Sequence, residues 1–162
     1  MENEDYRIIT LFNNSIKVFR DGRVQVLGRQ SPNIGVYYDK VCILNHGYLR
    51  LQLSFEKKHK IYRVHRIVAM AFLGFDIDSK LLIDHINHNI TDNNLINLRI
   101  ATHSQNQMNT INKGYSWHKD KSKWISSIRL NGKKYFLGYF VEEEDARQAY
   151  LQGRIKYFGE WA

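Results

Sequence analysis

Apolar residues in this chain come in short alternating runs broken by turn residues, and this pattern restricts the fold to small antiparallel sheets. Such runs fill residues 6–55, where Asp21-Gly22 separates two of them. Two longer runs, at 124–130 and 133–140, flank Asn131-Gly132. Asp-Gly and Asn-Gly between alternating runs are strong hairpin signals. The sequence therefore predicts an α+β protein built mainly from antiparallel strands.

Two segments instead show the periodicity of helices. Residues 64–73 are expected to form a helix that ends at Gly74, because glycine readily adopts the left-handed backbone of a helix end. His65 would be a structural histidine at its entrance, with contact to an active site or to DNA as the alternative. A second helix is expected over 141–159. Its first turn is acidic, which complements the helix dipole. Its expected core positions are Ala146, Ala149, Tyr150 and Ile155.

A polar stretch between the two β-rich parts carries candidate chemistry. Asp84 and His85 follow the apolar residues 81–83, and Asn97 and Asn106 come later. Carboxylate and amide oxygens are ligands for hard divalent cations, and a neutral imidazole can accept a proton from water. The simpler interpretations are a loop cap for Asn97 and a solvated helix residue for Asn106. Together the residue types suit metal-assisted phosphodiester cleavage.

The surrounding loop leaves one ligand alternative open. Residues 87–94 are rich in Asn and Asp, which suit tight turns, so we interpret His88, Asn89, Asp92, Asn93 and Asn94 as turn residues. Asp92 among them is a weaker alternative metal ligand. Thr102, followed three positions later by Gln105, predicts a capping box and a helix starting near His103, which would carry Asn106.

This stretch resembles the HNH endonuclease family, and most closely its phage-type, intron-associated homing endonucleases. The matching segments are VHRIVAMAF at 64–72, DH at 84–85, NLRIAT at 97–102 and SQN at 104–106. The resemblance implies a ββα-metal core around one divalent ion, expected to be Mg²⁺, with Mn²⁺ or another hard cation as alternatives. It implies Asp84 and Asn106 as metal ligands and His85 as the general base. It also implies that Asn97 orients His85 through the second ring nitrogen.

The C-terminal segment resembles the APETALA-type (ethylene-response-factor) DNA-binding domain. GYSW, KWISSIR, NGKKYFLGYF and EEEDARQAY carry this resemblance over residues 114–162. It implies a three-stranded sheet that lies in the DNA major groove, with one helix packed behind it. Strand alternation would turn Trp124, Ser126 and Ile128 toward the helix. The expected DNA-binding residues are Ser116, His118, Lys119, Lys121, Lys123, Ile125, Ser127, Arg129, Lys133, Lys134 and Phe136.

Charge and composition fit a nucleic-acid partner. The chain has 162 residues, a net charge of +8 and one cysteine, Cys42, which excludes an internal disulfide and a zinc site built on cysteine pairs. An excess of basic residues favours a polyanion, here double-stranded DNA. We expect an N-terminal β unit at 1–56, a nuclease core at 57–111 and a DNA-binding domain at 112–162. Without a signal-peptide pattern, the expected location is the cytoplasm of a bacterial host or phage-infected cell.

The function predicted from the sequence is a site-selective HNH nuclease that acts as a monomer on DNA and nicks one strand. The main alternative is a DNA-binding regulator without catalysis. An RNA-binding or RNA-cleaving protein is a further alternative, because RNA is a polyanion as well. A membrane partner is not expected, and the absence of a Gly-rich phosphate loop disfavours a small-molecule enzyme.

Overall fold

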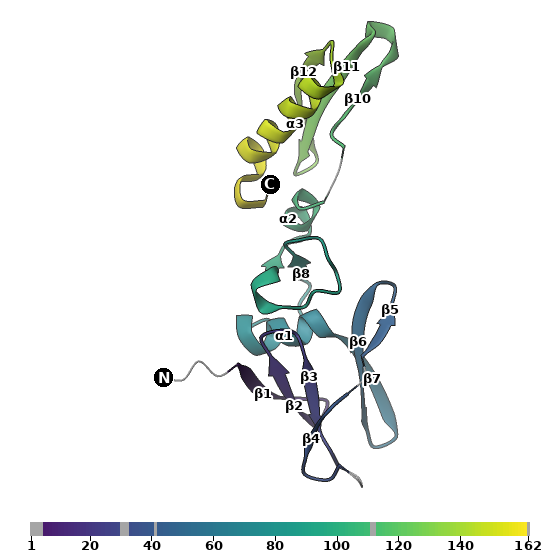
Figure 1. Ribbon diagram of the computed structural model, residues 1–162, viewed down its shortest axis with the longest axis vertical. Helices are drawn as coiled ribbons and strands as arrows, with labels where there is room; N and C mark the ends of the chain where they lie inside the picture. Colours follow the sequence, from purple (N-terminus) through teal and green to yellow (C-terminus); the bar gives the residue numbers. More distant parts are fainter. Residues whose placement is uncertain (1–4, 30–32, 41, 111–112, 162) are drawn as a thin grey trace. The chain divides into compact units, whose positions relative to one another are not determined.

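The first of two compact units begins with a four-stranded antiparallel sheet in the order β1-β2-β3-β4 (Figure 1). The computed structural model describes residues 5–29, 33–40, 42–110 and 113–161, and the units are 1–101 and 102–162. The predicted hairpin around Asp21-Gly22 is confirmed, since β2 pairs with β3 and Gly22 has a φ of 91°. The strands are β1 (Tyr6–Leu11), β2 (Asn14–Phe19), β3 (Val24–Leu27) and β4 (Tyr37–Asp39).

A second antiparallel sheet, in the order β5-β6-β7, leads directly into the first helix. Its strands are β5 (Ile43–Asn45), β6 (Tyr48–Phe55) and β7 (Lys58–Arg63). Helix α1 (Val64–Leu73) starts at the residue after β7 and ends at Gly74, whose φ is 67°. The helix and the glycine end predicted from the sequence are therefore confirmed.

One hydrophobic core joins both sheets to α1. It includes residues of β2, β6 and α1 that are fully excluded from solvent, and it extends to Ile83 and Leu98. Arg7 of β1 also donates from Nη1 to the carbonyl of Ala71 at 2.8 Å. The sequence had suggested a boundary between residues 56 and 57, whereas this core is continuous across that position. The other suggested boundary, at 111/112, lies outside the described residues.

A two-stranded hairpin completes the first unit. Strand β8 (Leu82–His85) pairs with β9 (Leu98–Ala101), with Asp84 opposite Arg99 and His85 opposite Leu98. The short 3₁₀ turn η1 (Leu95–Asn97) leads into β9. Ile83 and Leu98 are buried in the core, which anchors both strands of the hairpin to α1 and the sheets.

The second unit starts with α2 (His103–Met108), whose predicted capping box between Thr102 and Gln105 is present. A three-stranded antiparallel sheet follows, in the order β10-β11-β12, and α3 packs on it. The turn at Asn131-Gly132 has φ values of 50° and 79°, as a type I′ hairpin requires. The remaining elements are β10 (Tyr115–His118), η2 (Lys119–Lys121), β11 (Lys123–Leu130), β12 (Lys133–Phe140), α3 (Glu143–Phe158) and η3 (Gly159–Trp161).

Helix α3 covers one face of this sheet, as predicted. Ser126 and Ile128 of β11 are buried, as are Ala146 and Tyr150 of α3. The expectation for Ile155 was wrong, since that side chain is 69% exposed. Gly153 faces the sheet instead, and a Cβ built there would lie 2.7 Å from Ile128 Cδ1. The absence of a side chain at Gly153 therefore allows α3 to approach β11 closely.

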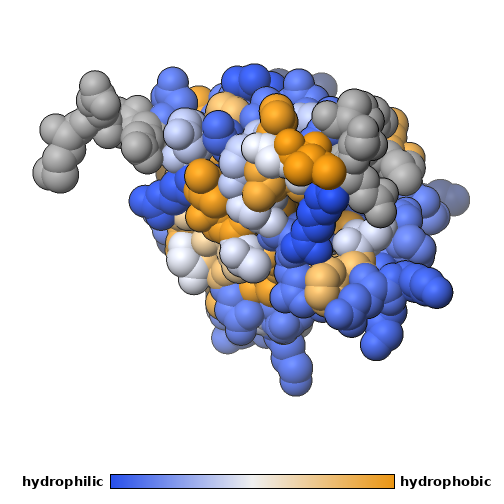
Figure 2. Space-filling view, turned by 90° about the horizontal axis from the view of Figure 1, so that it is seen from below, coloured by the Kyte–Doolittle hydropathy of each residue, from blue (hydrophilic) through white to orange (hydrophobic). Residues whose placement is uncertain are grey.

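Viewed from below, the molecule is largely hydrophilic, with apolar residues gathered near the centre of that face (Figure 2). Exposed large apolar side chains of the first unit include Ile8, Ile34, Val36, Leu44 and Ile61. None of the helices in the described ranges is long and apolar enough to cross a lipid bilayer.

Candidate active site

Asp84 and His85 lie at the end of β8, where the first unit holds both side chains away from solvent. Asp84 is 6% and His85 5% exposed. The segment entering β8 is fixed by Arg66 of α1, whose Nη2 donates to the carbonyls of Ile77 at 2.7 Å and Ser79 at 3.0 Å. A helix residue thus sets the path of the chain that delivers the carboxylate and the imidazole.

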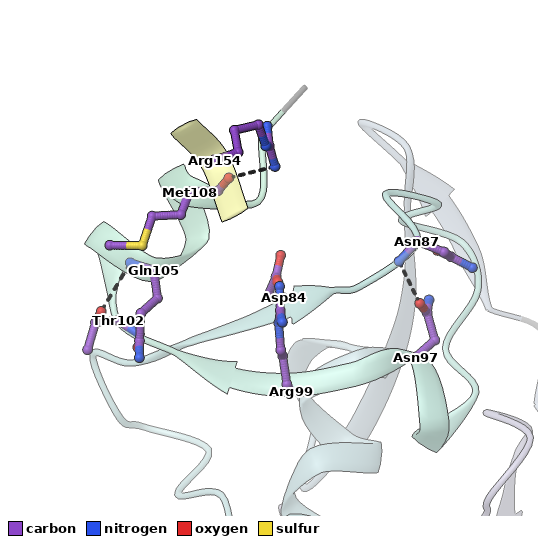
Figure 3. Close-up of polar contacts among 8 residues, drawn as sticks. All are labelled: Asp84, Asn87, Asn97, Arg99, Thr102, Gln105, Met108 and Arg154. Carbon is purple, nitrogen blue, oxygen red and sulfur yellow. Dashed lines mark hydrogen bonds and ion pairs between the residues drawn. The ribbon is translucent and has the colours of Figure 1, made fainter. Parts of the chain in front are cut away.

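The Asp84 carboxylate forms an ion pair across the β8–β9 hairpin. Arg99 Nε donates to Asp84 Oδ2 at 2.8 Å, and the two residues face each other in register (Figure 3). A buried carboxylate needs a compensating charge or hydrogen bonds, and Arg99 supplies both. The strand register therefore holds a charged partner against Asp84 in a site with little solvent.

The His85 ring is held by an amide of the loop between β8 and β9. His85 Nε2 lies 3.3 Å from Oδ1 of Asn93, which is also buried. Burial lowers the pKa of His85 below its usual value, while Asn93 and the nearby carboxylates Asp84 and Asp92 act in the opposite direction. Because the effect of burial on the pKa is the largest, the imidazole is neutral at neutral pH, which is the form that can accept a proton.

Two aromatic rings pack around His85. His65 of α1 makes an edge-to-face contact with His85 at 5.1 Å between ring centroids, and Tyr48 of β6 contacts His65 in the same way at 5.2 Å. Burial, followed by the proximity of His85, lowers the pKa of His65 to about 3. His65 is therefore neutral. The burial of His65 fits the structural role expected from the sequence, and its ring also contacts His85, a candidate active-site residue.

Asn97 caps the loop between β8 and β9. Its Oδ1 accepts from the backbone N–H of Asn87 at 2.9 Å, and its Nδ2 donates to the carbonyl of Asp92 at 2.8 Å (Figure 3). The sequence had assigned the orienting contact with His85 to Asn97 and had treated Asn93 as a turn residue. The amide seen against His85 Nε2 is that of Asn93, and Asn97 holds the two ends of the loop that carries it.

Asp92, the alternative metal ligand, is engaged in the same loop. Its Oδ2 accepts from Asn87 Nδ2 at 2.7 Å, and its Oδ1 accepts from the backbone N–H of Asn94 at 3.2 Å. Both carboxylate oxygens thus accept hydrogen bonds from within the turn. Asx turns of this kind are the expected use of Asp in a tight loop.

The predicted metal ligands belong to different units. Asp84 is in the first unit, and Asn106 lies on α2 of the second, where its backbone N–H donates to the Thr102 carbonyl at 3.0 Å. Pairing of these two side chains on one cation stays a prediction. Both donors are hard oxygens, which suit Mg²⁺ or a similar ion. A metal site built only from His, Cys, Asp or Glu would need at least three of these side chains close together. No such group is found within the described residues.

Helix α2 is tied to α3 within the second unit. Arg154 of α3 donates to the carbonyls of Met108 at 3.1 Å and Thr110 at 3.0 Å (Figure 3). Carbonyls at a helix end lack partners inside the helix, and a basic side chain also suits the negative end of the helix dipole. The helix that carries Asn106 is therefore fixed to the C-terminal sheet and helix.

The face of the C-terminal sheet that α3 leaves uncovered is basic and aromatic. On it, Arg129 lies opposite Lys134 and Ser127 opposite Phe136. Phe136 is 56% exposed. The residues that strand alternation had predicted for this face are Ser116, His118, Ile125, Ser127, Arg129, Lys134 and Phe136. Whether any of them binds DNA stays a prediction, as it does for Lys119, Lys121, Lys123 and Lys133.

Sequence alternation missed one aromatic residue of this face. The register between β11 and β12 shifts after Ser126, so Ser126 pairs with Gly138 and Ile125 with Tyr139. The shift is a β-bulge, which reverses the sides of the residues beyond it. Tyr139 thereby joins the uncovered face, where its ring contacts Phe136 at 5.0 Å and Lys121 Nζ lies 4.2 Å from its centroid.

Comparisons with known proteins point to one family. Residues 62–108 match the HNH endonuclease family. An HNH endonuclease of Acanthamoeba polyphaga mimivirus is 31% identical over 103 residues, which cover 62% of this chain and 55% of that protein. A protein named as an HNH homing endonuclease from the SPbeta prophage of Bacillus subtilis (strain 168) is 34% identical over 76 residues, 46% of this chain and 43% of that protein. This chain thus spans about half the length of these relatives.

A solved structure shares the fold. The structure titled DNA binding and cleavage by the HNH homing endonuclease I-HmuI superposes with a TM-score of 0.52 and 21% identity, covering 93% of this chain and 87% of that one. The α+β class predicted from the sequence is therefore confirmed.

Proposed function

We propose, from the premise that residues 62–108 belong to the HNH endonuclease family, that this protein is a metal-dependent DNA endonuclease that nicks one strand of a duplex. The observation that carries the proposal is the buried pair Asp84 and His85 at the end of β8. One residue of the pair is a carboxylate that forms an ion pair with Arg99. The other is an imidazole that burial keeps neutral. A metal-assisted phosphodiester hydrolase can use the first group to hold a cation and the second to take a proton from water.

His85 is proposed as the general base. Its neutral ring takes a proton from a water molecule, which then attacks the phosphorus of the scissile phosphate. Asn97 acts indirectly, because it fixes the loop from Asn87 to Asp92 and so limits the positions open to the ring. A base held in one orientation is more effective than a mobile one, because reacting groups are then already close and aligned.

Asp84 and Asn106 are proposed to hold one divalent cation, with Mg²⁺ as the first expectation and Mn²⁺ as an alternative. Bound there, the cation would neutralise charge that develops on the phosphate and on the leaving oxygen. The role of Asn106 rests on its residue type and on the sequence resemblance. Arg99 would orient the Asp84 carboxylate in either case, through its 2.8 Å contact.

Two basic surfaces are proposed to bind the DNA duplex. On the β6–β7 ribbon, Arg50 lies directly opposite Arg63, a like-charge pair that costs stability unless an anion compensates it. The ribbon ends in exposed Lys57 and Lys58, and a two-stranded ribbon fits the major groove of B-DNA. The second surface is the uncovered face of the C-terminal sheet, in keeping with the predicted APETALA-type domain.

The proposal is tested by incubating the protein, which we expect to act as a monomer, with supercoiled plasmid and Mg²⁺. We expect nicked circles, and no cleavage when a chelator replaces the cation. Linear product without a nicked intermediate would contradict single-strand nicking. A plasmid left unchanged across Mg²⁺, Mn²⁺ and other divalent ions would favour the non-catalytic DNA-binding alternative, and stronger competition by structured RNA than by duplex DNA would favour an RNA partner.

Replacing both Arg129 and Lys134 with alanine should weaken DNA binding. The two side chains lie opposite each other on β11 and β12 and are exposed. If each neutralises one phosphate, the slope of log affinity against log salt should fall by about two. Fluorescence anisotropy with a labelled duplex over a salt series measures this slope.

The matched control removes the same charge from the helix side of the same unit. Arg147 and Lys156 are exposed on α3, and their double alanine variant should keep the slope of the unmodified protein. Equal effects of the two double variants would show that net charge alone governs binding, which would contradict a binding surface on the sheet.

A further inference from the structure

We propose that Asn93 is a positioning residue that fixes the tautomer of His85, and that Gly22 of the β2–β3 turn holds Asn93 in place. This inference rests on the proposed endonuclease function. It concerns a contact between the loop at 86–94 and the first sheet, two segments far apart in the sequence. The contact involves only residues of the first unit.

The orientation of the Asn93 amide follows from its second partner. Asn93 Nδ2 donates to the carbonyl of Thr91 at 3.3 Å, and a carbonyl can only accept. The amide group cannot therefore be turned over without placing two acceptors together. Its Oδ1 is then the atom that faces His85 Nε2 at 3.3 Å.

This orientation decides which ring nitrogen of His85 carries the proton. Because Oδ1 only accepts, Nε2 must be the donor, and in a neutral imidazole the lone pair then belongs to Nδ1. Nδ1 is accordingly the nitrogen that would take a proton from water. Asn93 and His85 are each 5% exposed, so water competes little for the contact between them.

Gly22 lies directly against Asn93. A Cβ built on Gly22 would lie 2.8 Å from the C, O and Cβ atoms of Asn93. Such a distance is well inside van der Waals contact, so any larger residue would displace Asn93. The backbone N–H of Leu95 also donates to the Arg20 carbonyl at 2.7 Å. The turn between β2 and β3 thus forms the surface on which the loop carrying Asn93 rests.

Two variants of Asn93 separate an orienting role from a merely structural one. Asn93→Asp keeps an acceptor toward His85 but loses the donor to Thr91, whereas Asn93→Ala loses both. If the acceptor orients His85, Asn93→Ala should lower the single-turnover cleavage rate by about tenfold to a hundredfold, and Asn93→Asp should recover most of it. The dissociation constant for DNA should be unchanged in both. Equal losses in the two variants would assign Asn93 to loop structure alone and overturn the proposal.

Gly22→Ala should lower the cleavage rate to a similar extent, with DNA binding retained. Alanine is also strained at positive φ, so the matched control is Gly35→Ala. Gly35 lies in the same unit with a φ of 73°, and a Cβ built on it would meet no other atom within 4 Å. This control should cleave like the unmodified protein. If Gly35→Ala loses as much activity as Gly22→Ala, backbone strain explains the loss and the contact with Asn93 does not.

A measurement that needs no cleavage keeps this inference separate from the proposed function. Long-range ¹H–¹⁵N spectra of the unmodified protein report which nitrogen of His85 is protonated. We expect Nε2–H in the unmodified protein and a mixture of tautomers in Asn93→Ala. A predominant Nδ1–H form in the unmodified protein would overturn the inference even if the plasmid is cut. An Nε2–H form in a protein that cuts no DNA would leave the inference standing and the proposed function contradicted.

Discussion

Replacing His85 with alanine is expected to lower the rate of strand cleavage by about 10²- to 10⁴-fold, the range that a positioned general base contributes. Alanine cannot accept a proton from water, and the contact with Asn93 Oδ1 is lost with the ring. The surfaces proposed to bind DNA lie on other elements, so the dissociation constant for DNA should stay within about twofold. Single-turnover cleavage and fluorescence anisotropy measure the two quantities independently.

A histidine of the loop that follows β8 provides the control for His85. His88 is exposed and has a φ of 64°, a backbone conformation that asparagine tolerates well. His88→Asn should therefore leave both cleavage and binding unchanged. If His85→Ala still cleaves at the rate of the unmodified protein, His85 is not the base. That outcome combined with intact DNA binding would support a regulator that uses the nuclease fold as a scaffold.

Replacing Asp84 with asparagine is expected to reduce cleavage by at least about a hundredfold, because a metal ligand contributes several kcal/mol to stabilising the developing charge. Asparagine keeps the size of the side chain and one oxygen toward Arg99, but it removes the negative charge. We also expect Mg²⁺ to stabilise the unmodified protein but not this variant, since a ligand that binds only the folded state raises its stability. Thermal unfolding with and without Mg²⁺ measures this second effect.

In this variant, a loss of activity caused by unfolding must be distinguished from one caused by loss of the cation. Arg99 is partly buried against Asp84, and removing one member of a buried pair destabilises a protein. Urea unfolding in a chelator gives that cost directly. Asp78→Ala, which removes a carboxylate from the segment before β8, should leave the response to Mg²⁺ intact. An unchanged Mg²⁺ shift in Asp84→Asn would mean that the cation binds elsewhere.

Features set by neighbouring residues could be predicted from the sequence. The hairpins at Asp21-Gly22 and Asn131-Gly132 follow from local backbone preferences, and α1 follows from apolar spacing and a terminal glycine. The capping box of α2 depends on two side chains only three residues apart. Such features need no knowledge of the tertiary fold.

Features set by contacts between distant segments could not be predicted in this way. Asn93 lies in a run of turn-forming residues, and only folding places it between His85 and Gly22. The bulge after Ser126 brings Tyr139 to the uncovered face, although strict alternation would have put Gly138 there. Ile155 shows the opposite error, since its apolar side chain suggested burial and the neighbouring Gly153 occupies the contact instead.

The continuous core of the first unit has a consequence for modular exchange. The matched nuclease segment begins at residue 62, yet α1 shares its buried surface with Ile16 and Val18 of the first sheet and with Leu51 and Leu53 of the second. Cutting the chain at residue 62 would open that surface to water. A transplant of the segment that carries Asp84 and His85 into another protein must therefore include residues 5–61 as well, and it must extend past the junction between Ala101 and Thr102 to keep Asn106, the second proposed metal ligand.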